Sequence, residues 1–421
     1  MTSRKWIRQT PLLMQLLLVC VAVLYLVMLQ PVVAERNGKS HSRLVAFADL
    51  HGDVHNCRLL LQAANIIDAD DRWIAGNATV VQLGDIADRG RHSHEIYDLF
   101  ESLEIQAAEA GGEFIFLVGN HELMNLLGDY TYVHKDMMTV FGGKAQYAAA
   151  FSPTGDYGSY ILQHKVVLVR GGIVFAHGGI TPLYAAKGVD GINAAFHDGF
   201  NCQDQQNNNG INAGPHACHP FRAADSPVWS RQLVYDARKG DCGLLTESLR
   251  LLSAAERAAG RPPVHAMTVG HTIQAGGGIA LLCGGRLIAA DVGLSRYAWS
   301  GGGHAAFVEF PPPQRTAAPQ YPYGRGVRPA VGDPHTQKIR PPRRLHTPQE
   351  QERESHEAVL QKPPAAVDAP SPLMDVSVEA PHTGLVDYVF LFLLFAIVGS
   401  LFVLKTWKSL VRVFRVNLKE K

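Results

Sequence analysis

The sequence predicts an α/β fold whose functional side chains gather at the carboxyl ends of short buried strands. Apolar runs rich in β-branched residues each end in a polar cluster, and helix-like stretches lie between the early runs. The polar clusters also hold the chemically most active residues of the chain. Because open α/β sheets bind ligands where their strands end, we expect the site at these clusters.

The predicted strands follow one another through the middle of the chain. RLVAFAD runs into LHGD, and ATVVQLGD runs into IADRG. The six runs are Arg43–Asp49, Ala78–Asp85, Glu113–Asn120, Gly172–Gly179, Ala266–Thr272 and Arg286–Gly293. Between the early runs, CRLLLQAANII and HSHEIYDLFESLEIQAAEA have the apolar spacing of helices.

Composition excludes several classes of function. The 421 residues are 47% apolar and 18% charged, which suits one large globular domain or two small ones. The formal net charge of +1 leaves no broad basic field, so no nucleic-acid partner is expected. No two of the six cysteines form a CxxC pair, which argues against a zinc finger.

Both ends of the chain carry apolar segments typical of membrane targeting. Residues 1–34 combine a basic start with a long apolar stretch, as a signal peptide or an uncleaved signal anchor does. Residues 386–404 are long and apolar enough for a transmembrane helix, and the tail 405–421 is rich in Lys and Arg. By the positive-inside rule this tail is cytosolic, so we expect a membrane protein whose body is lumenal or extracellular.

The folded body is predicted at residues 42–311. Residues 312–384 are dominated by proline and charge, and we expect a disordered stalk there. Within the body, Cys202 and Cys218 bracket a polar loop. A disulfide between them and two free thiols are both open readings.

Six oxygen or nitrogen donors stand at the ends of the predicted strands. They are Asp49, His51, Asp85, Asn120, His177 and His271. A set without thiolate suits Mn, Fe or Zn. Six ligands exceed the need of one tetrahedral ion, whereas two divalent ions that share a bridging carboxylate would use them all, as in centres that displace phosphate esters.

The other histidines considered lack this placement, and we interpret them as surface residues. They are His55, His92, His94, His164, His216 and His219.

The motifs FADLHGD, LGDIADRG, LVGNHE, HGG and VGHT occur in this order, and together they resemble those of the metallo-dependent phosphoprotein phosphatases, the calcineurin-like metallophosphoesterases. The longer stretches LVGNHELMN, SPVWSR and VGHTIQAGGGI resemble the Shewanella-like protein phosphatase branch. The resemblance covers about residues 43–296 and implies a four-layer α/β/β/α sandwich. One departure is Ala48, where the usual motif has Gly.

The resemblance also implies how the two ions are held. Asp49 and His51 would bind the first ion, Asp85 would bridge, and Asn120, His177 and His271 would bind the second. Glu122 is expected to pin its loop.

Catalytic roles follow from the same resemblance. His121 would be the general acid, oriented by Asp88. Arg89 would grip the substrate phosphate, as would Arg231, for which Arg222 is a rival in the same linker.

The implied reaction is direct attack of a metal-bound hydroxide on phosphorus, with inversion and no phosphoenzyme. We expect a membrane-anchored phosphatase that acts on phosphorylated proteins. Dinucleoside polyphosphates or other small phosphoanhydrides are alternative substrates, and an inactive lumenal binding module is a third possibility. A thiol-based tyrosine phosphatase is disfavoured, because no cysteine lies in a CxxxxxR cradle.

Overall fold

The first of two sheets brings the N-terminal strands together. A computed structural model describes residues 42–201, 218–298, 301–313, 315–329 and 332–342. In it β1 (Leu44–Phe47), β2 (Thr79–Gln82) and β3 (Glu113–Phe116) run parallel. Two later strands, β9 (Phe307–Glu309) and β10 (Ala318–Gln320), extend this sheet antiparallel, in the order β10-β9-β1-β2-β3.

The second sheet has the order β4-β5-β6-β8-β7. Its centre is parallel and consists of β5 (Ile173–Ala176), β6 (Ala266–Val269) and β8 (Leu287–Ala289). The edges β4 (Val167–Arg170) and β7 (Ala280–Leu282) are antiparallel to their neighbours. Both sheets are therefore mixed, each with a parallel core.

Alternating side chains build a separate core on each face of the strands. On β1, Leu44 and Ala46 join a buried cluster with Phe175 and Ile288 of the second sheet, so the two sheets pack face to face. Val45 and Phe47 point the other way, into the core beneath the helices.

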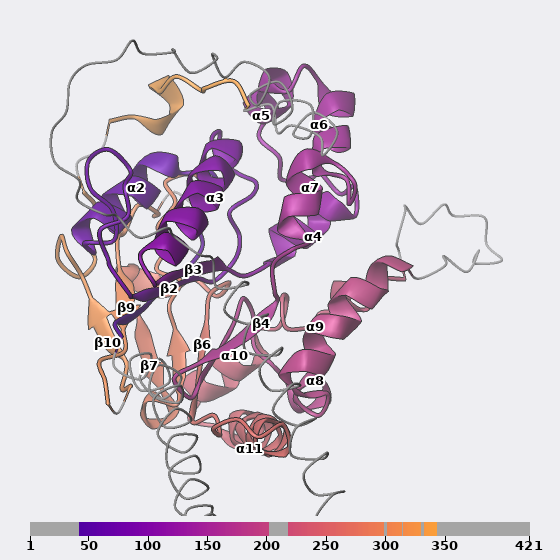
Figure 1. Cartoon of the computed structure of the whole chain (residues 1–421), viewed down its shortest axis with the longest axis vertical. Coiled ribbons are helices and arrows are strands. Elements are labelled where there is room, and N and C mark those ends of the chain that lie inside the picture. The colour runs from indigo at the N-terminus through magenta and orange to yellow at the C-terminus, as the bar shows by residue number, and fades with distance from the viewer. Residues whose placement is uncertain (1–41, 202–217, 299–300, 314, 330–331, 343–421) are drawn as a thin grey trace, which may run out of the picture. The chain divides into compact units, whose positions relative to one another are not determined.

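The helices cover the outer faces of the sheets (Figure 1). Over the first sheet lie α2 (Val54–Ala63) and α3 (Ser93–Glu109), and over the second lie α8 (Pro182–Ala185), α9 (Gly188–Asp198) and α11 (Gly243–Ala258). Between β3 and β4 the chain forms α4 (Asn120–Leu126), α5 (Lys135–Val140), α6 (Lys144–Phe151) and α7 (Asp156–Ile161). A short helix, α10 (Gln232–Arg238), precedes α11.

All six predicted strands are present, but the predicted end of the body at residue 311 is wrong. Within the segment expected to be a stalk, β10 pairs with β9. Arg340 is hydrogen-bonded to α3: its carbonyl oxygen contacts His94 Nε2, and its backbone N–H donates to Glu95 Oε1. The edge of β9 that faces away from β1 and the buried start of α3 therefore give the described residues of this Pro-rich segment their partners.

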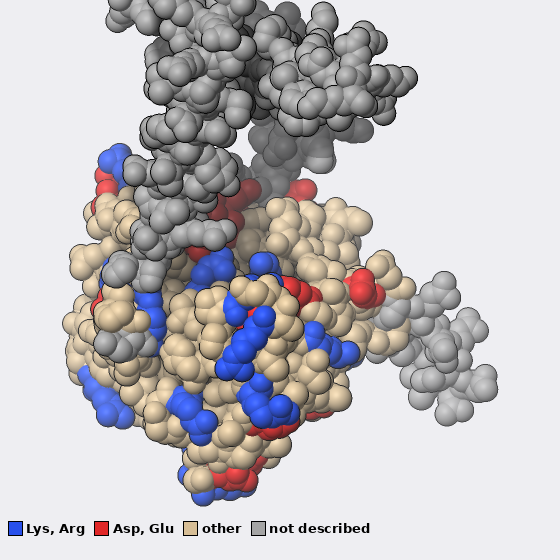
Figure 2. Space-filling model, turned by 60° about the horizontal axis from the view of Figure 1, so that its bottom comes forward, with Lys and Arg blue, Asp and Glu red and all other residues tan. Residues whose placement is uncertain are grey.

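Some predictions concern parts of the chain outside the described residues. They are the segments 1–34, 386–404 and 405–421, His216, and the Cys202 half of the proposed disulfide. Among the residues that are described, no helix has the length and apolar character to cross a bilayer. Lys and Arg side chains on the face shown in Figure 2 form separate groups between neutral residues.

Candidate metal centre

The candidate site is built on loops that follow six strands, three from each sheet. Asp49 and His51 follow β1; Asp85, Asp88 and Arg89 follow β2; Asn120 and His121 follow β3; and His177, His271 and Asp291 follow β5, β6 and β8. The face-to-face packing of the sheets therefore brings residues more than 200 positions apart into one buried cluster.

The backbone of these loops is strained in the way that functional sites often are. Five non-glycine residues adopt positive φ: His51 (40°), Asp85 (59°), Asp88 (69°), Arg89 (62°) and His271 (59°). Positive φ is uncommon for residues other than glycine, so the surrounding structure must hold these residues in that conformation. The turns after β1, β2 and β6 thus aim their side chains at a common point.

Three imidazoles are each anchored by a backbone carbonyl. His51 Nδ1 lies 3.1 Å from Ala87 O, His177 Nδ1 lies 2.8 Å from Leu83 O, and His271 Nε2 lies 3.0 Å from Trp229 O. A carbonyl oxygen accepts a hydrogen bond, so the anchored nitrogen of each ring carries a hydrogen. In the neutral ring the other nitrogen keeps a lone pair, and this nitrogen faces into the cluster.

Those inward nitrogens converge on Asp85. The Asp85 Oδ2 atom lies 3.2 Å from His177 Nε2 and 3.7 Å from His51 Nε2. His177 Nε2 is also 2.9 Å from Asn120 Oδ1 and 3.2 Å from His271 Nδ1. Lone pairs pointing at lone pairs repel one another unless a cation lies between them, so this geometry fits bound metal.

The electrostatics lead to the same conclusion. Burial opposes protonation of His177, but Asp85 and Asp49 outweigh it and raise its pKa to about 10. Burial, helped by Asp291, raises the pKa of the Asp49 carboxyl well above its ordinary value. Burial likewise raises the pKa of Asp291 to about 6. The pocket is thus short of positive charge, which divalent ions would supply.

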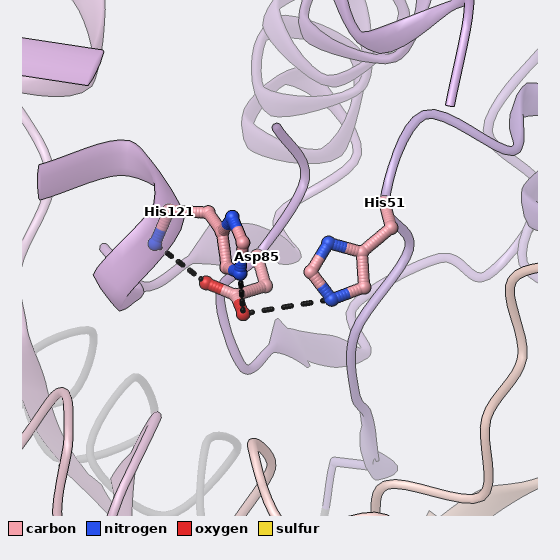
Figure 3. Close-up of side chains that lie close together, drawn as sticks. All are labelled: His51, Asp85 and His121. Carbon is pink, nitrogen blue, oxygen red and sulfur yellow. Dashed lines mark hydrogen bonds and ion pairs between the residues drawn. The ribbon is translucent and has the colours of Figure 1, made fainter. Parts of the chain in front are cut away.

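Two groups of potential ligand atoms share Asp85. Within the described residues, one group is His51, Asp85 and His121, and the other is Asp85, His177 and His271. Figure 3 shows the rings of His51 and His121 on either side of the Asp85 carboxylate. The shared position of Asp85 agrees with the predicted bridging role.

Among the described residues, Asp49 belongs to neither of these two groups. Its Oδ1 accepts the backbone N–H of His271 at 3.0 Å, and its Oδ2 is 3.9 Å from His51 Nε2. His121 takes the third place of the group with His51 instead, with Nε2 at 3.9 Å from Asp85 Oδ2. The assignment of His121 as acid and Asp49 as ligand stays a prediction.

His121 and Asp88, predicted as the general acid and the group that orients it, are in contact. His121 Nδ1 lies 2.7 Å from Asp88 Oδ2, and the backbone N–H of His121 donates to Asp85 Oδ1 at 3.0 Å. Burial opposes protonation of His121, but Asp85 and Asp88 outweigh it and raise its pKa above the ordinary value. The ring is thus suited to keep a proton until it is needed.

Two arginines approach the cluster from different sides. The Arg89 guanidinium lies over the Tyr132 ring at 5.0 Å, with Nη2 3.5 Å from His121 Nε2. Arg231 Nη2 lies 3.4 Å from His271 Nδ1, whereas Arg222 is exposed and lines a separate cavity of about 90 Å³. The geometry therefore favours Arg231 over Arg222 as the second phosphate contact.

Glu122 pins the loop after β2, as expected. Its carboxylate accepts the backbone N–H groups of Asp85, Ile86 and Ala87 at 2.8 to 2.9 Å, and that of Gly119 at 2.8 Å. The turn that carries the bridging carboxylate is thereby tied to the start of α4.

Sequence reasoning missed three contributors to the site. Asp291 is buried beside Asp49 and ends the sixth predicted strand, RLIAADVG, so its position was a readable signal. The carbonyl of Trp229 and the ring of Tyr132 gave no signal, because backbone atoms and loop aromatics have no pattern that points to a site.

The interpretation of three histidines as surface residues is wrong. His92, His94 and His219 are buried. His94 Nε2 lies 2.8 Å from Arg340 O, and His219 Nε2 lies 3.0 Å from Phe196 O. These rings fill the packing between loops and helices, a role that sequence spacing does not reveal.

Comparison with known proteins places the chain among phosphatases. The profile of the calcineurin-like phosphoesterase family matches residues 42–220. Shewanella-like protein phosphatase 2 of Arabidopsis thaliana is 31% identical over 298 residues, which are 60% of this chain and 72% of the relative. An uncharacterized protein of Schizosaccharomyces pombe is 30% identical over 269 residues, and the match covers 60% of this chain and 74% of that protein.

The fold is also similar to that of a solved structure. The cold-active protein-tyrosine phosphatase of a psychrophilic Shewanella superposes with a TM-score of 0.52 at 23% identity. The match covers 67% of this chain and 78% of the other.

Proposed function

Because the chain belongs to the calcineurin-like phosphoesterases, and within them to the Shewanella-like protein phosphatases, we propose that it hydrolyses phosphomonoesters of phosphoproteins. It is a phosphoric ester hydrolase by family. The narrower assignment to phosphoproteins is supported by the name of the Arabidopsis relative, a protein phosphatase.

The shared position of Asp85 carries the proposal. One carboxylate belongs to both groups of ligand atoms, as a two-ion centre requires. His51 and Asp49 would hold one ion, and Asn120, His177 and His271 the other. When bound, two divalent ions such as Mn, Fe or Zn polarise a phosphoryl group and lower the pKa of a water.

The remaining residues would bind and protonate the substrate. Arg89 and Arg231 flank the cluster and would hold phosphate oxygens. Among the described residues, Nε of Arg89 has no hydrogen-bond partner, which leaves this guanidinium available to a substrate. His121 would donate the proton on Nε2 to the leaving oxygen while Asp88 holds Nδ1.

Activity of the purified chain tests this proposal. With Mn²⁺ it should hydrolyse p-nitrophenyl phosphate, and on a panel it should prefer phosphopeptides to diadenosine tetraphosphate. Preference for the dinucleotide would move the substrate to small phosphoanhydrides. Folded protein without turnover under any divalent metal would make the chain a binding module.

We also infer from the sequence that residues 386–404 span a bilayer and that the basic tail is cytosolic. Protease added outside sealed vesicles should then remove the tail and spare the body. Digestion of the body with survival of the tail would reverse the orientation.

A further inference from the structure

A buried chain of hydrogen bonds connects helix α6 with the ring of His121. Tyr147 Oη donates to Asn125 Oδ1 at 2.8 Å, and Asn125 Nδ2 donates to Asp88 Oδ1 at 2.9 Å. Asp88 Oδ2 then holds His121 Nδ1 at 2.7 Å. All four side chains are buried.

The direction of these bonds is determined by the donors available. Asn125 Nδ2 has two protons, and both have acceptors, the Asp88 carboxylate and the backbone carbonyl of His121 at 2.8 Å. The amide oxygen must therefore face Tyr147, whose hydroxyl must donate. Burial raises the pKa of Tyr147 well above its ordinary value, so the hydroxyl stays neutral. The network has one fully satisfied arrangement.

We propose that Asn125 and Tyr147 are positioning residues that hold Asp88, and through it His121, in the orientation needed to protonate the leaving group. The inference rests on the proposed role of His121 as general acid. Asp88 has two carboxylate oxygens, and each has its own donor, His121 on one and Asn125 on the other. Without Asn125 the carboxylate would have an unsatisfied buried oxygen and could rotate away from the ring.

Ring stacking between helices α6 and α7 holds the Tyr147 side chain in place. Its ring stacks on Phe151 at a centroid distance of 4.4 Å, and Phe151 stacks on Tyr157 at 5.1 Å. Tyr157 is equally part of this stack, but its hydroxyl donates to Asp98 at 3.2 Å and has no link to Asp88. Tyr157→Phe is therefore a matched control for Tyr147→Phe.

The dependence of rate on the leaving group tests the proposal. The full chain with Mn²⁺ is assayed on phosphomonoesters whose leaving groups range from dinitrophenol, which departs without a proton, to an alkyl alcohol, which needs one. We expect Tyr147→Phe and Asn125→Leu to stay within about 3-fold of the parent kcat/KM on the dinitrophenyl ester. On the alkyl ester they should lose roughly 10-fold and 100-fold.

A double variant separates positioning from general damage. Tyr157→Phe should not change the leaving-group dependence, and Tyr147→Phe added to His121→Asn should cause no further loss on the alkyl ester. An equal loss on all esters, or a further loss in the His121→Asn background, would overturn the inference.

The controls also keep this test apart from the proposed function. If Asn125→Leu does not fold, Tyr147→Phe alone decides. If the parent protein is active but His121→Asn shows no leaving-group dependence, the inference fails while the phosphatase assignment stands. A parent protein without phosphomonoesterase activity would refute the phosphatase assignment, and the inference with it.

Discussion

At the scale of single residues, Asp85 and Glu122 together define the centre of the site. The Oδ2 atom of Asp85 faces three imidazoles, and its Oδ1 atom accepts a hydrogen bond from the backbone N–H of His121. Its own backbone is held at positive φ by the Glu122 carboxylate. The shared ligand is thus placed by a second buried acid rather than by its own conformational preference.

The first prediction follows from that position. Asp85→Asn should remove bound metal and reduce activity by more than the roughly 10–100-fold that loss of an outer-shell partner costs. Elemental analysis with Mn²⁺ kinetics checks both. Glu256→Gln, which alters a buried acid paired with Arg261 outside the site, should keep its metal. Two ions per chain in the Asp85 variant would show that Asp85 does not bridge.

At the scale of elements, a half-buried acid, Glu104, joins α3 to the end of α7. Glu104 Oε2 accepts the Tyr160 hydroxyl at 3.1 Å, and burial raises the pKa of Glu104 to about 7. In the unfolded chain a glutamate titrates near 4.5. Between these values the folded protein keeps a proton that the unfolded chain has lost, so this group destabilises the fold as pH rises.

Glu104→Gln should therefore stabilise the fold more at pH 8 than at pH 5. The difference in unfolding free energy between variant and parent should grow with pH, by at most about 1.4 kcal/mol per unit between 4.5 and 7. Urea unfolding at several pH values measures it. A constant difference for Glu104→Gln would place its pKa near the ordinary value.

A disulfide ties α11 to the second sheet. Cys242 is the N-cap residue of α11, and Cys283 lies in the turn between β7 and β8. The bond closes a loop across a separation of 41 residues. Closing a loop of this size lowers the conformational entropy of the unfolded chain and so stabilises the folded state.

Replacing both cysteines by serine should lower the unfolding free energy by about 2–4 kcal/mol. Activity at 25 °C should change little, because neither residue is near the metal centre. Denaturant unfolding with and without dithiothreitol checks this: the reductant should destabilise the parent more than the double variant. Equal sensitivity of both proteins would mean that the bond does not stabilise the fold.

At the scale of the whole body, the centre joins two sheets. Asp49, His51, Asp85 and Asn120 come from the first sheet, and His177 and His271 come from the second. Bound ions would therefore connect the two sheets. Ligands that bind only the folded state add to its stability.

Removing metal should thus weaken the whole fold. Mn²⁺ at a hundred times its Kd should raise the unfolding free energy of chelator-treated protein by about 2.7 kcal/mol. Urea unfolding with and without Mn²⁺ measures this gain, and Asp85→Asn should lack it. A gain of the same size in that variant would place the stabilising ion elsewhere.

The positions of the six strands along the chain, and the candidate ligand residues that follow them, could be read from the sequence because both depend on local patterns. Apolar runs ending in Asp, His or Asn mark a strand followed by its functional loop, and all six such runs form strands. Each motif lies within a few residues, so no long-range contact is needed to read it.

Other features were decided only by the tertiary structure. The Cys242–Cys283 bond, the burial of His92, the strand β10 and the link from Tyr147 to Asp88 all join segments distant in sequence. Such contacts depend on how two sheets and their helices pack, and no local periodicity encodes them. The sequence alone thus determined which residues could form a metal centre, and packing decided what surrounds them and holds them in place.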